Sequence, residues 1–409
     1  MDKASLFAAA ERVADWMVAN QVTDRLDANR GRSVCVFDKT TDFYRMTTSW
    51  ETGIMCMGLL AMYKRTGKQL YLDRAELAGR FIMSLQVLDQ RQDRYYGVFR
   101  EVSPQAIEFC PRDATTAAWA LVWLYETVKN PEYLDRAILF GNWHLKHGMC
   151  NGWPLHGIFM DGQFTDHYAK GSFQSGTGLF YRDLFMMTGD SRYIEQGLRP
   201  IAETYRNDFF NADGSLIMYR DVFSNKDISK TMSTSSGDDM HKYNDDFGNA
   251  MLQTAADIFG DESFRETACK YALWLAAHQD QDGGFGNGGA PSGVPVSLMY
   301  FNDLGDYYKN TGLLAARDKT LAKLLAMQYQ GTGDRRLDGG FQGTTHNFDA
   351  ATREKGAGKI SVDMRTSAYA LNALLRLESR LENVCLGRNN TEFSDPLFSM
   401  EEKPYLFRW

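Results

Sequence analysis

The sequence predicts an all-α protein folded as an (α/α)6 toroid, a barrel of six helical hairpins with long loops on one rim. A turn motif recurs at intervals of about 60 residues, which suits two helices and one long connection. The motif at 66–75 returns most closely at 130–137. The second helix of many pairs is small and apolar on every face, as at 114–121, which is typical of a helix buried inside a ring.

Each turn has a physical basis in its residues. Glycine ends one helix in a left-handed conformation, Asp or Ser opens the next helix, and Tyr-Leu begins its apolar face. Looser copies of the motif occur at 188–194, 260–264 and 311–314. We therefore expect six outer helices, the first over about 6–22 and the others beginning near Tyr71, Tyr133, Tyr193, Phe264 and Leu313.

Each outer helix is followed by a long irregular stretch and then by an inner helix. The expected inner helices begin near Trp50, Asp113, Ser172, His241, Val296 and Val362. Because the short turns all join inner to outer helices, they share one rim, and the long loops share the other. The long-loop rim is the expected functional face, since the inner helices present free N–H groups and positive dipole ends there.

Length, charge and composition narrow the function classes. We expect one catalytic domain over 1–409, with 381–409 as a C-terminal extension. The net charge of −7 without a basic run argues against nucleic acid or an anionic membrane as partner. No apolar run approaches the roughly 18–20 residues of a membrane span. The expected protein is soluble, and cytoplasmic unless a leader was removed, in which case it is periplasmic or secreted. The sequence does not predict its oligomeric state.

Neither a metal nor a cofactor is expected. The six cysteines form no CxxC pair and are typical of scattered buried thiols. His144 and His147 have a spacing that could hold a metal, but no third ligand lies near them in the sequence.

Polar and titratable residues are densest at 241–246, which reads His-Lys-Tyr-Asn-Asp-Asp. Helix capping explains one or two of these residues but not six in a row, so the stretch is a candidate functional site. The other inner-helix starts and nearby loops add further polar and aromatic groups. The residues predicted to bind substrate are Trp50, Glu51, Arg112, Asp113, Trp153, His167, Tyr168, Lys170, Lys242, Asp245 and Asp246. Asp113 also fits a capping role, and Trp50 also fits a core role.

Two long loops carry a Gly-Gly-Phe turn, at 279–286 and 338–343. These turns resemble the Gln/Gly/aromatic motif of triterpene cyclases and protein prenyltransferases, and similar turns recur in toroid carbohydrate enzymes. The resemblance implies the toroid and not the reaction.

The first functional hypothesis is a polysaccharide lyase that acts by β-elimination on an acidic, uronic-acid-containing polysaccharide or oligosaccharide. The group at 241–246 resembles the Asn, His, Arg and Tyr set of toroid lyases that cleave alginate and glucuronan. Elimination needs a group that neutralises the uronate carboxylate, a base that takes the C5 proton, and an acid that protonates the departing O4. The resemblance implies that Asn244 and Arg365 bind the carboxylate, that His241 takes the proton, and that Tyr243 or Tyr300 protonates the leaving oxygen.

Two other hypotheses stay open. A six-hairpin glycoside hydrolase acting on uronic-acid-containing glycans needs two carboxylates, and Asp245-Asp246 looks like the paired Asp of some toroid glycosidases. Glu51, Asp113, Asp303 or Asp363 could supply the partner, and a sugar epimerase is not separated from this class. An isoprenoid cyclase is the weakest hypothesis, because its Asp-x-Asp-Asp acid differs at one position from the residues at 243–246.

Overall fold

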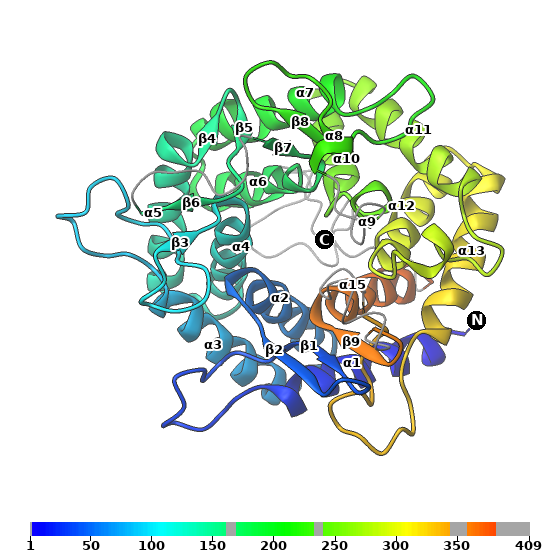
Figure 1. Ribbon diagram of the computed structural model, residues 1–409, viewed down its shortest axis with the longest axis horizontal. Helices are drawn as coiled ribbons and strands as arrows, with labels where there is room; N and C mark the ends of the chain where they lie inside the picture. Colours follow the sequence, from blue (N-terminus) through cyan, green and yellow to red (C-terminus); the bar gives the residue numbers. More distant parts are fainter. Residues whose placement is uncertain (1, 161–168, 233–239, 344–357, 382–409) are drawn as a thin grey trace.

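Six helical hairpins close into a ring in the computed structural model, which describes residues 2–160, 169–232, 240–343 and 358–381 (Figure 1). The inner helices are α2 (Ser49–Thr66), α4 (Pro111–Val128), α6 (Thr177–Thr188), α10 (Gly248–Phe259), α12 (Gly293–Tyr307) and α15 (Met364–Leu381). The outer helices are α1 (Lys3–Asn20), α3 (Gln69–Ser84), α5 (Pro131–His147), η2 (Tyr193–Leu198) with α7 (Arg199–Asp208), α11 (Ser263–Ala277) and α13 (Thr311–Ala326). The predicted toroid is confirmed.

Local sequence accounts for most helix boundaries. Thr48 and Glu51 form a capping box at the start of α2, and Gly67 ends that helix with φ 70°. The fourth outer helix opens as a π-helical segment, η2, and becomes α-helical at Arg199. Pro200 follows directly, and its ring excludes a regular helical bond to the preceding turn.

Two inner helices begin later than predicted. The third begins at Thr177 after the short 3-10 helix η1 (Ser172–Gln174), and the fourth begins at Gly248 after the single turn α9 (Met240–Tyr243). Asp246 and Phe247 have φ values of 46° and 75°, and this left-handed pair separates α9 from α10. The polar stretch at 241–246 therefore precedes the inner helix and does not form its first turn.

The long loops pair with their neighbours as short antiparallel strands around one rim. The strand β1 (Val34–Asp38) pairs with β2 (Phe43–Met46) and with β9 (Ser361–Asp363), which joins the two ends of the ring. The other pairs are β3 (Glu108–Phe109) with β6 (Ile158–Phe159), β4 (Met149–Cys150) with β5 (Trp153–Pro154), and β7 (Ala169–Gly171) with β8 (Tyr219–Asp221). The short helix α8 (Ser229–Met232) and the 3-10 turn η3 (Gly286–Gly288) complete the described loops.

Glycine turns bring five of the long loops against the next outer helix. Gly339 has φ 99°, and a Cβ atom there would collide with the carbonyl oxygen of Arg12 on α1. The Gln328 side chain donates to the carbonyl oxygens of Gly339 and Ala9, both at 2.9 Å, and so ties the last loop to the first helix. Four further glycines approach the neighbouring outer helix in the same way: Gly31, Gly97, Gly214 and Gly283.

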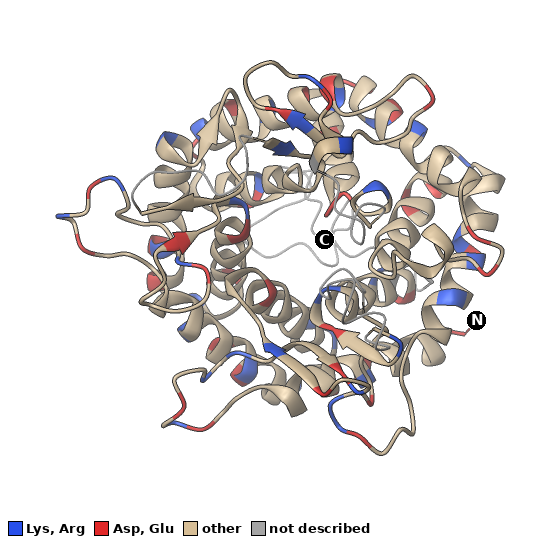
Figure 2. Cartoon of the chain, in the orientation of Figure 1, with Lys and Arg blue, Asp and Glu red and all other residues tan. Residues whose placement is uncertain are grey.

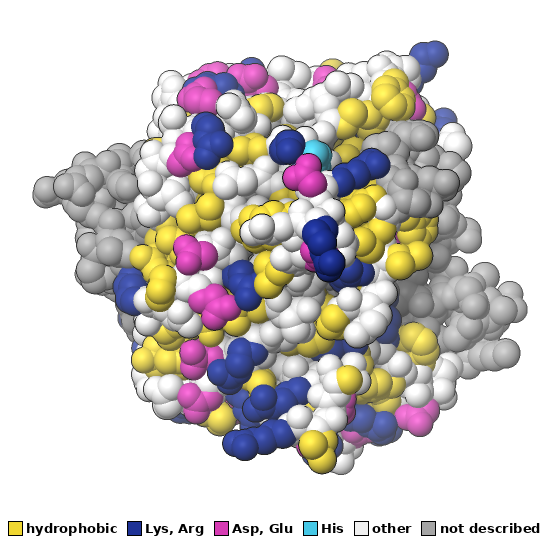
Figure 3. Space-filling view, turned by 90° about the vertical axis from the view of Figure 1, so that its left-hand side faces the viewer, with side chains coloured by type: hydrophobic (Ala, Val, Ile, Leu, Met, Phe, Trp, Pro, Cys, Tyr) yellow, Lys and Arg dark blue, Asp and Glu magenta, His cyan; other side chains and the backbone are white. Residues whose placement is uncertain are grey.

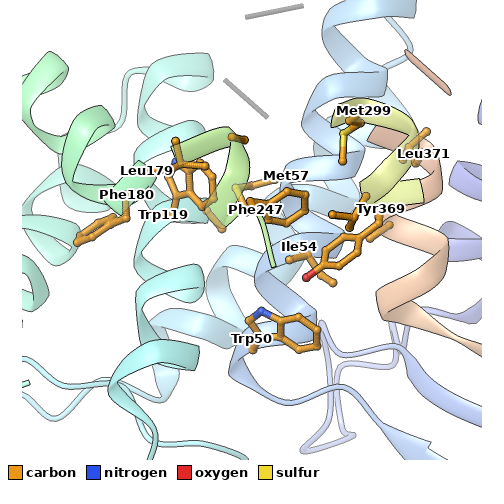
Figure 4. Packing of buried hydrophobic residues seen from close by; sticks show 14 of the residues in the cluster. Trp50, Ile54, Met57, Trp119, Leu179, Phe180, Phe247, Met299, Tyr369 and Leu371 are labelled. Atoms are coloured by element: carbon orange, nitrogen blue, oxygen red, sulfur yellow. The ribbon is translucent and has the colours of Figure 1, made fainter. Parts of the chain in front are cut away.

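Apolar side chains fill the space between the inner helices. Figure 4 shows Phe247 and Tyr369 beside Trp50 in this core, and the rings of Phe247 and Tyr369 lie 4.6 Å apart. Charged residues are distributed all around the ring (Figure 2), and acidic and basic side chains are interspersed with hydrophobic ones on one flank (Figure 3). Within the described ranges, every helix is too short or too polar to cross a membrane.

Candidate active site

The centre of the candidate site is a buried ion-pair network around Arg112, at the start of α4. Its guanidinium group donates to Asp113 Oδ1 at 2.9 Å and to Asp246 Oδ2 at 2.5 Å. Asp246 is 2% exposed, whereas Asp113 is half-buried. Because one guanidinium group serves both acceptors, the two carboxylate oxygens lie within roughly 8 Å of each other. The tertiary fold thus brings together two predicted carboxylates and the predicted arginine.

Two arginines lie close to the Trp50 ring at this site. The Arg112 guanidinium carbon is 4.8 Å from the centre of the indole ring, and that of Arg365 is 4.5 Å from it. A cavity of about 20 Å³, large enough for one water molecule, lies beside them. Its lining includes Trp50, Arg112, Trp119, Asp246 and Tyr369.

Asp246 is held in its charged form. Burial alone raises the pKa of its carboxyl group, but the positive charges of Arg112 and Arg365 outweigh burial and lower the pKa below its ordinary value. The Tyr369 hydroxyl donates to Asp246 Oδ1 at 2.8 Å. This carboxylate is therefore an ionised group at the edge of the cavity.

The Asp245 side chain points away from the cavity and stabilises the fold. Its carboxylate accepts the hydroxyl groups of Tyr205 at 2.7 Å and Tyr300 at 2.5 Å, and the backbone N–H of Asn249 at 2.8 Å. It is 0% exposed, and burial raises its pKa to about 6 despite these three donors. The adjacent aspartates thus do not face one substrate atom, as expected, although the left-handed conformation of Asp246, and not a helix, separates them.

The raised pKa of Asp245 predicts a pH-dependent stability. Between about pH 4 and pH 6 the folded protein binds more protons at this group than the unfolded chain, so its contribution favours folding at low pH and is lost as the pH rises. An Asp245→Asn variant lacks this titration. We expect its free energy of unfolding to rise relative to wild type by roughly 2–3 kcal/mol between pH 4 and pH 7. Urea denaturation across this range measures the difference, and parallel curves would contradict the assignment.

His241 and Arg365 lie close enough to Asp246, beside the cavity, to act on its charge. His241 is half-buried, and its ring stacks on Phe173 with centres 4.4 Å apart. Its Nδ1 atom has no hydrogen-bond partner in the described part of the chain. Burial lowers the pKa of His241 to about 3, so the imidazole is neutral at pH 7. Arg365 is half-buried and forms no ion pair within 4 Å among the described residues.

Three other residues predicted to be catalytic are engaged in the fold. The Tyr243 ring stacks between Trp274 and Phe285, with centres 5.8 and 5.5 Å away. Asn244 accepts the backbone N–H of Asp246 at 2.9 Å and donates to Ser292 at 3.1 Å. The Tyr300 hydroxyl is bound to Asp245. The structure therefore does not gather these three side chains around the cavity.

The remaining predicted binding residues also have partners of their own. Glu51 accepts the Thr48 backbone N–H at 2.7 Å in the capping box. Trp153 stacks on Phe209 at 4.7 Å, inside the protein. Lys170 donates to Asn225 at 3.0 Å, and the Lys242 ammonium lies 5.3 Å from the Trp274 ring centre. His167 and Tyr168 lie outside the described residues.

Glu101 is a candidate that the sequence did not reveal. It lies in the loop before α4, half-buried, and its Oε2 accepts the Ser49 hydroxyl at 3.3 Å. Burial, followed by the negative charges of Asp113 and Glu51, raises its pKa well above the ordinary value. No motif surrounds this residue, so only its position beside other carboxylates identifies it. Phe173 and Tyr369 were also missed, because aromatic residues on inner helices and loops resemble core residues.

The described residues contain no group of three His, Cys, Asp or Glu side chains placed to hold a metal ion. The candidate site offers carboxylates, arginines, a neutral imidazole and aromatic rings.

Comparisons with known proteins agree with this fold. Residues 1–120 match the model of glycosyl hydrolase family 76. An uncharacterized protein of Caenorhabditis elegans is 37% identical over 100 residues, which is 23% of this chain and 13% of that protein's length.

Three solved structures resemble the whole ring. A cellobiose 2-epimerase from Bacillus thermoamylovorans has a TM-score of 0.66 at 11% identity, covering 89% of this chain and 98% of that one. An unsaturated glucuronyl hydrolase from Bacillus sp. GL1, responsible for the degradation of glycosaminoglycan, has a TM-score of 0.65 at 15% identity. The match covers 91% of this chain and 96% of that one. An inactive family 76 alpha-1,6-mannanase of Salegentibacter, with two adjacent aspartates replaced by asparagine, has a TM-score of 0.58 at 15% identity. The match covers 90% of this chain and 98% of that one. The chain thus shares the (α/α)6 toroid fold with these enzymes.

Proposed function

We propose that this protein is a glycoside hydrolase that cleaves a polysaccharide or oligosaccharide at the long-loop rim of the toroid. The observation that carries the proposal is the cluster of carboxyl groups around Arg112, in which Asp246 has a lowered pKa and Glu101, next to Asp113, has a raised pKa. An ionised carboxylate near a carboxyl group with a raised pKa is the combination that glycoside hydrolysis uses.

The shifted pKa values suggest a different catalytic role for each carboxyl group. Asp246 is ionised and would act as base or nucleophile at the sugar. Glu101, whose pKa is raised well above its ordinary value, would donate a proton to the leaving oxygen, since a raised pKa suits a general acid. Asp113 lies between them in this scheme and holds Arg112 in position.

The partial match to glycosyl hydrolase family 76 supports hydrolysis over the elimination predicted first. The residues proposed for elimination support the lyase hypothesis less well, because the side chains of Tyr243, Asn244 and Tyr300 form contacts within the fold, away from the cavity. A His241 with a pKa of about 3 is also a poor base for abstracting a proton at pH 7.

An acidic glycan remains the proposed substrate class because of Arg365. Its guanidinium group lies over Trp50, donates to the Met240 sulfur at 3.1 Å, and forms no ion pair within 4 Å in the described part of the chain. Such a group is suited to a bidentate contact with a sugar carboxylate.

Product analysis tests the reaction. Alginate, glucuronan, pectate, glycosaminoglycans and neutral mannans should be incubated with the protein while reducing ends and ultraviolet absorbance are followed. We expect reducing ends to appear without a rise in absorbance. A rise signals the conjugated double bond made by elimination and would return the choice to the lyase hypothesis, whereas conversion without new reducing ends would indicate epimerisation.

An Arg365→Lys variant tests the substrate class. A lysine keeps the charge but loses the planar fork, so we expect the KM for a uronate oligomer to rise about tenfold with little change in kcat. The same kinetics on a neutral mannan serve as the control and should not change. Equal KM values for variant and wild type on the uronate would remove Arg365 from carboxylate binding.

A further inference from the structure

A second cavity, far larger than the one beside Trp50, lies on the outer flank of the ring. It is an open cleft of about 670 Å³ lined by α1 and the loop that follows α13. Figure 1 shows where this helix and this loop meet, at the two ends of the ring. This volume falls within the range of about 300–1,000 Å³ that is usual for ligand sites. None of its lining residues borders the candidate active site.

Both walls of the cleft are fastened to each other. The Trp16 indole on α1 donates to the carbonyl oxygen of Arg336 at 2.8 Å. The Asn20 side chain donates to the carbonyl oxygen of Arg335 at 3.1 Å. With the contacts of Gln328 to Ala9 and Gly339, these bonds fix the loop on the helix. The cleft is therefore formed before any ligand binds, which lowers the cost of binding.

The charged groups along the cleft balance one another. The lining contains Arg12 and Arg335 together with Asp15 and Asp338, so their formal charges cancel. Arg12 donates to Gln328 Oε1 at 3.1 and 2.9 Å. Asp338 accepts the backbone N–H groups of Thr332 at 2.7 Å and Gly333 at 3.1 Å. A strongly charged ligand gains little from such a surface.

The same surface suits a ligand rich in hydroxyl groups. Asp15 and Arg335 are exposed, and the neighbouring Gln330 amide adds both donors and an acceptor. The half-buried Tyr329 ring supplies apolar surface within the cleft. Planar donors and acceptors beside an aromatic ring match the alternating hydroxyl and C–H faces of a sugar.

We propose that this cleft is a second binding site, for a neutral glycan chain, outside the candidate active site. The ligand class follows from the lining residues and not from the proposed reaction. The site would hold a polymer against the flank of the ring.

Affinity electrophoresis tests the proposal. Native gels should contain neutral mannan, β-glucan or starch, and a parallel gel should contain polyglucuronate. We expect at least one neutral polymer to retard the protein. Ala19→Trp, which fills the cleft from an exposed position of α1, should abolish the retardation, and Arg335→Ala should weaken the apparent affinity about tenfold. Ala4→Trp on the same helix and Arg25→Ala are matched controls at exposed positions away from the cleft.

The outcomes separate this proposal from the proposed reaction. Retardation that persists in Asp246→Asn but is lost in Ala19→Trp and weakened in Arg335→Ala supports the cleft, whether or not any polymer is cleaved. Three results would overturn it. The first is that no neutral polymer retards the protein, and the second is that polyglucuronate alone does. The third is that Ala19→Trp is retarded as much as Ala4→Trp while Arg335→Ala is unchanged. Absence of hydrolysis with the binding pattern intact would overturn only the proposed reaction.

Discussion

Replacing Asp246 by asparagine is expected to lower kcat on the cleaved glycan by about 10²–10⁴-fold, the usual contribution of a positioned acid or base. The substitution keeps the size of the side chain and an oxygen that can accept the Tyr369 hydroxyl, but it removes the negative charge beside Arg112. Release of reducing ends measures the loss. The thermal midpoint of the variant should be measured in parallel, because Arg112 is buried and the substitution leaves its charge less well paired.

Asp245→Asn is the matched control for this experiment. The two aspartates are adjacent and both buried, but the carboxylate of Asp245 contacts two tyrosine hydroxyls and a backbone N–H instead of the cavity. We expect its kcat to fall by less than about tenfold, since it takes no part in proton transfer. If Asp245→Asn abolished activity while Asp246→Asn kept it, the roles assigned to the two residues would be reversed.

Replacing Gly339 by alanine should cost about 2–5 kcal/mol of unfolding free energy, from overpacking and from a left-handed backbone. Its φ of 99° disfavours any side chain, and a Cβ atom would collide with the Arg12 carbonyl oxygen. This contact closes the ring between the last loop and α1. Chemical denaturation with the wild type measured in parallel gives the difference.

Gly331→Ala separates the two causes. Gly331 lies in the same loop with φ 66°, and a Cβ atom there would meet nothing within 4 Å. We expect a cost of only about 1 kcal/mol, due to the left-handed backbone alone. Equal costs for the two variants would mean that the close approach to α1 contributes nothing to stability.

The repeat pattern was sufficient to predict the architecture. The turn motif marks where inner helices end and outer helices begin, and those starts agree with the structure to within a few residues, as at Tyr133 and Phe264. The starts of α6 and α10 were misplaced, because the polar residues before them form separate turns. The Asn244 side chain bonds to the Asp246 backbone, and Asp245 bonds to the N–H of Asn249. Sequence cannot distinguish such local bonds from the first turn of a helix.

The glycine turns show a similar limit. The Gly-Gly-Phe pattern identified the turns at Gly283 and Gly339, whereas Gly31, Gly97 and Gly214 make the same approach without it. These positions share a left-handed backbone that lies against a neighbouring helix. That requirement appears in the sequence only as a glycine, with no surrounding motif to mark it.

The sequence by itself determined the six hairpins, the rim that carries the long loops, and the stretch richest in polar groups, because these follow from helical periodicity and turn chemistry along the chain. The tertiary structure decided which polar groups meet. Arg112 and Asp246 are 134 positions apart and form one ion pair, whereas Asp245, one residue away, faces the opposite side. Side-chain direction depends on backbone conformation and on neighbours from other hairpins, such as Tyr205, Tyr300 and Tyr369, and these neighbours are distant in sequence.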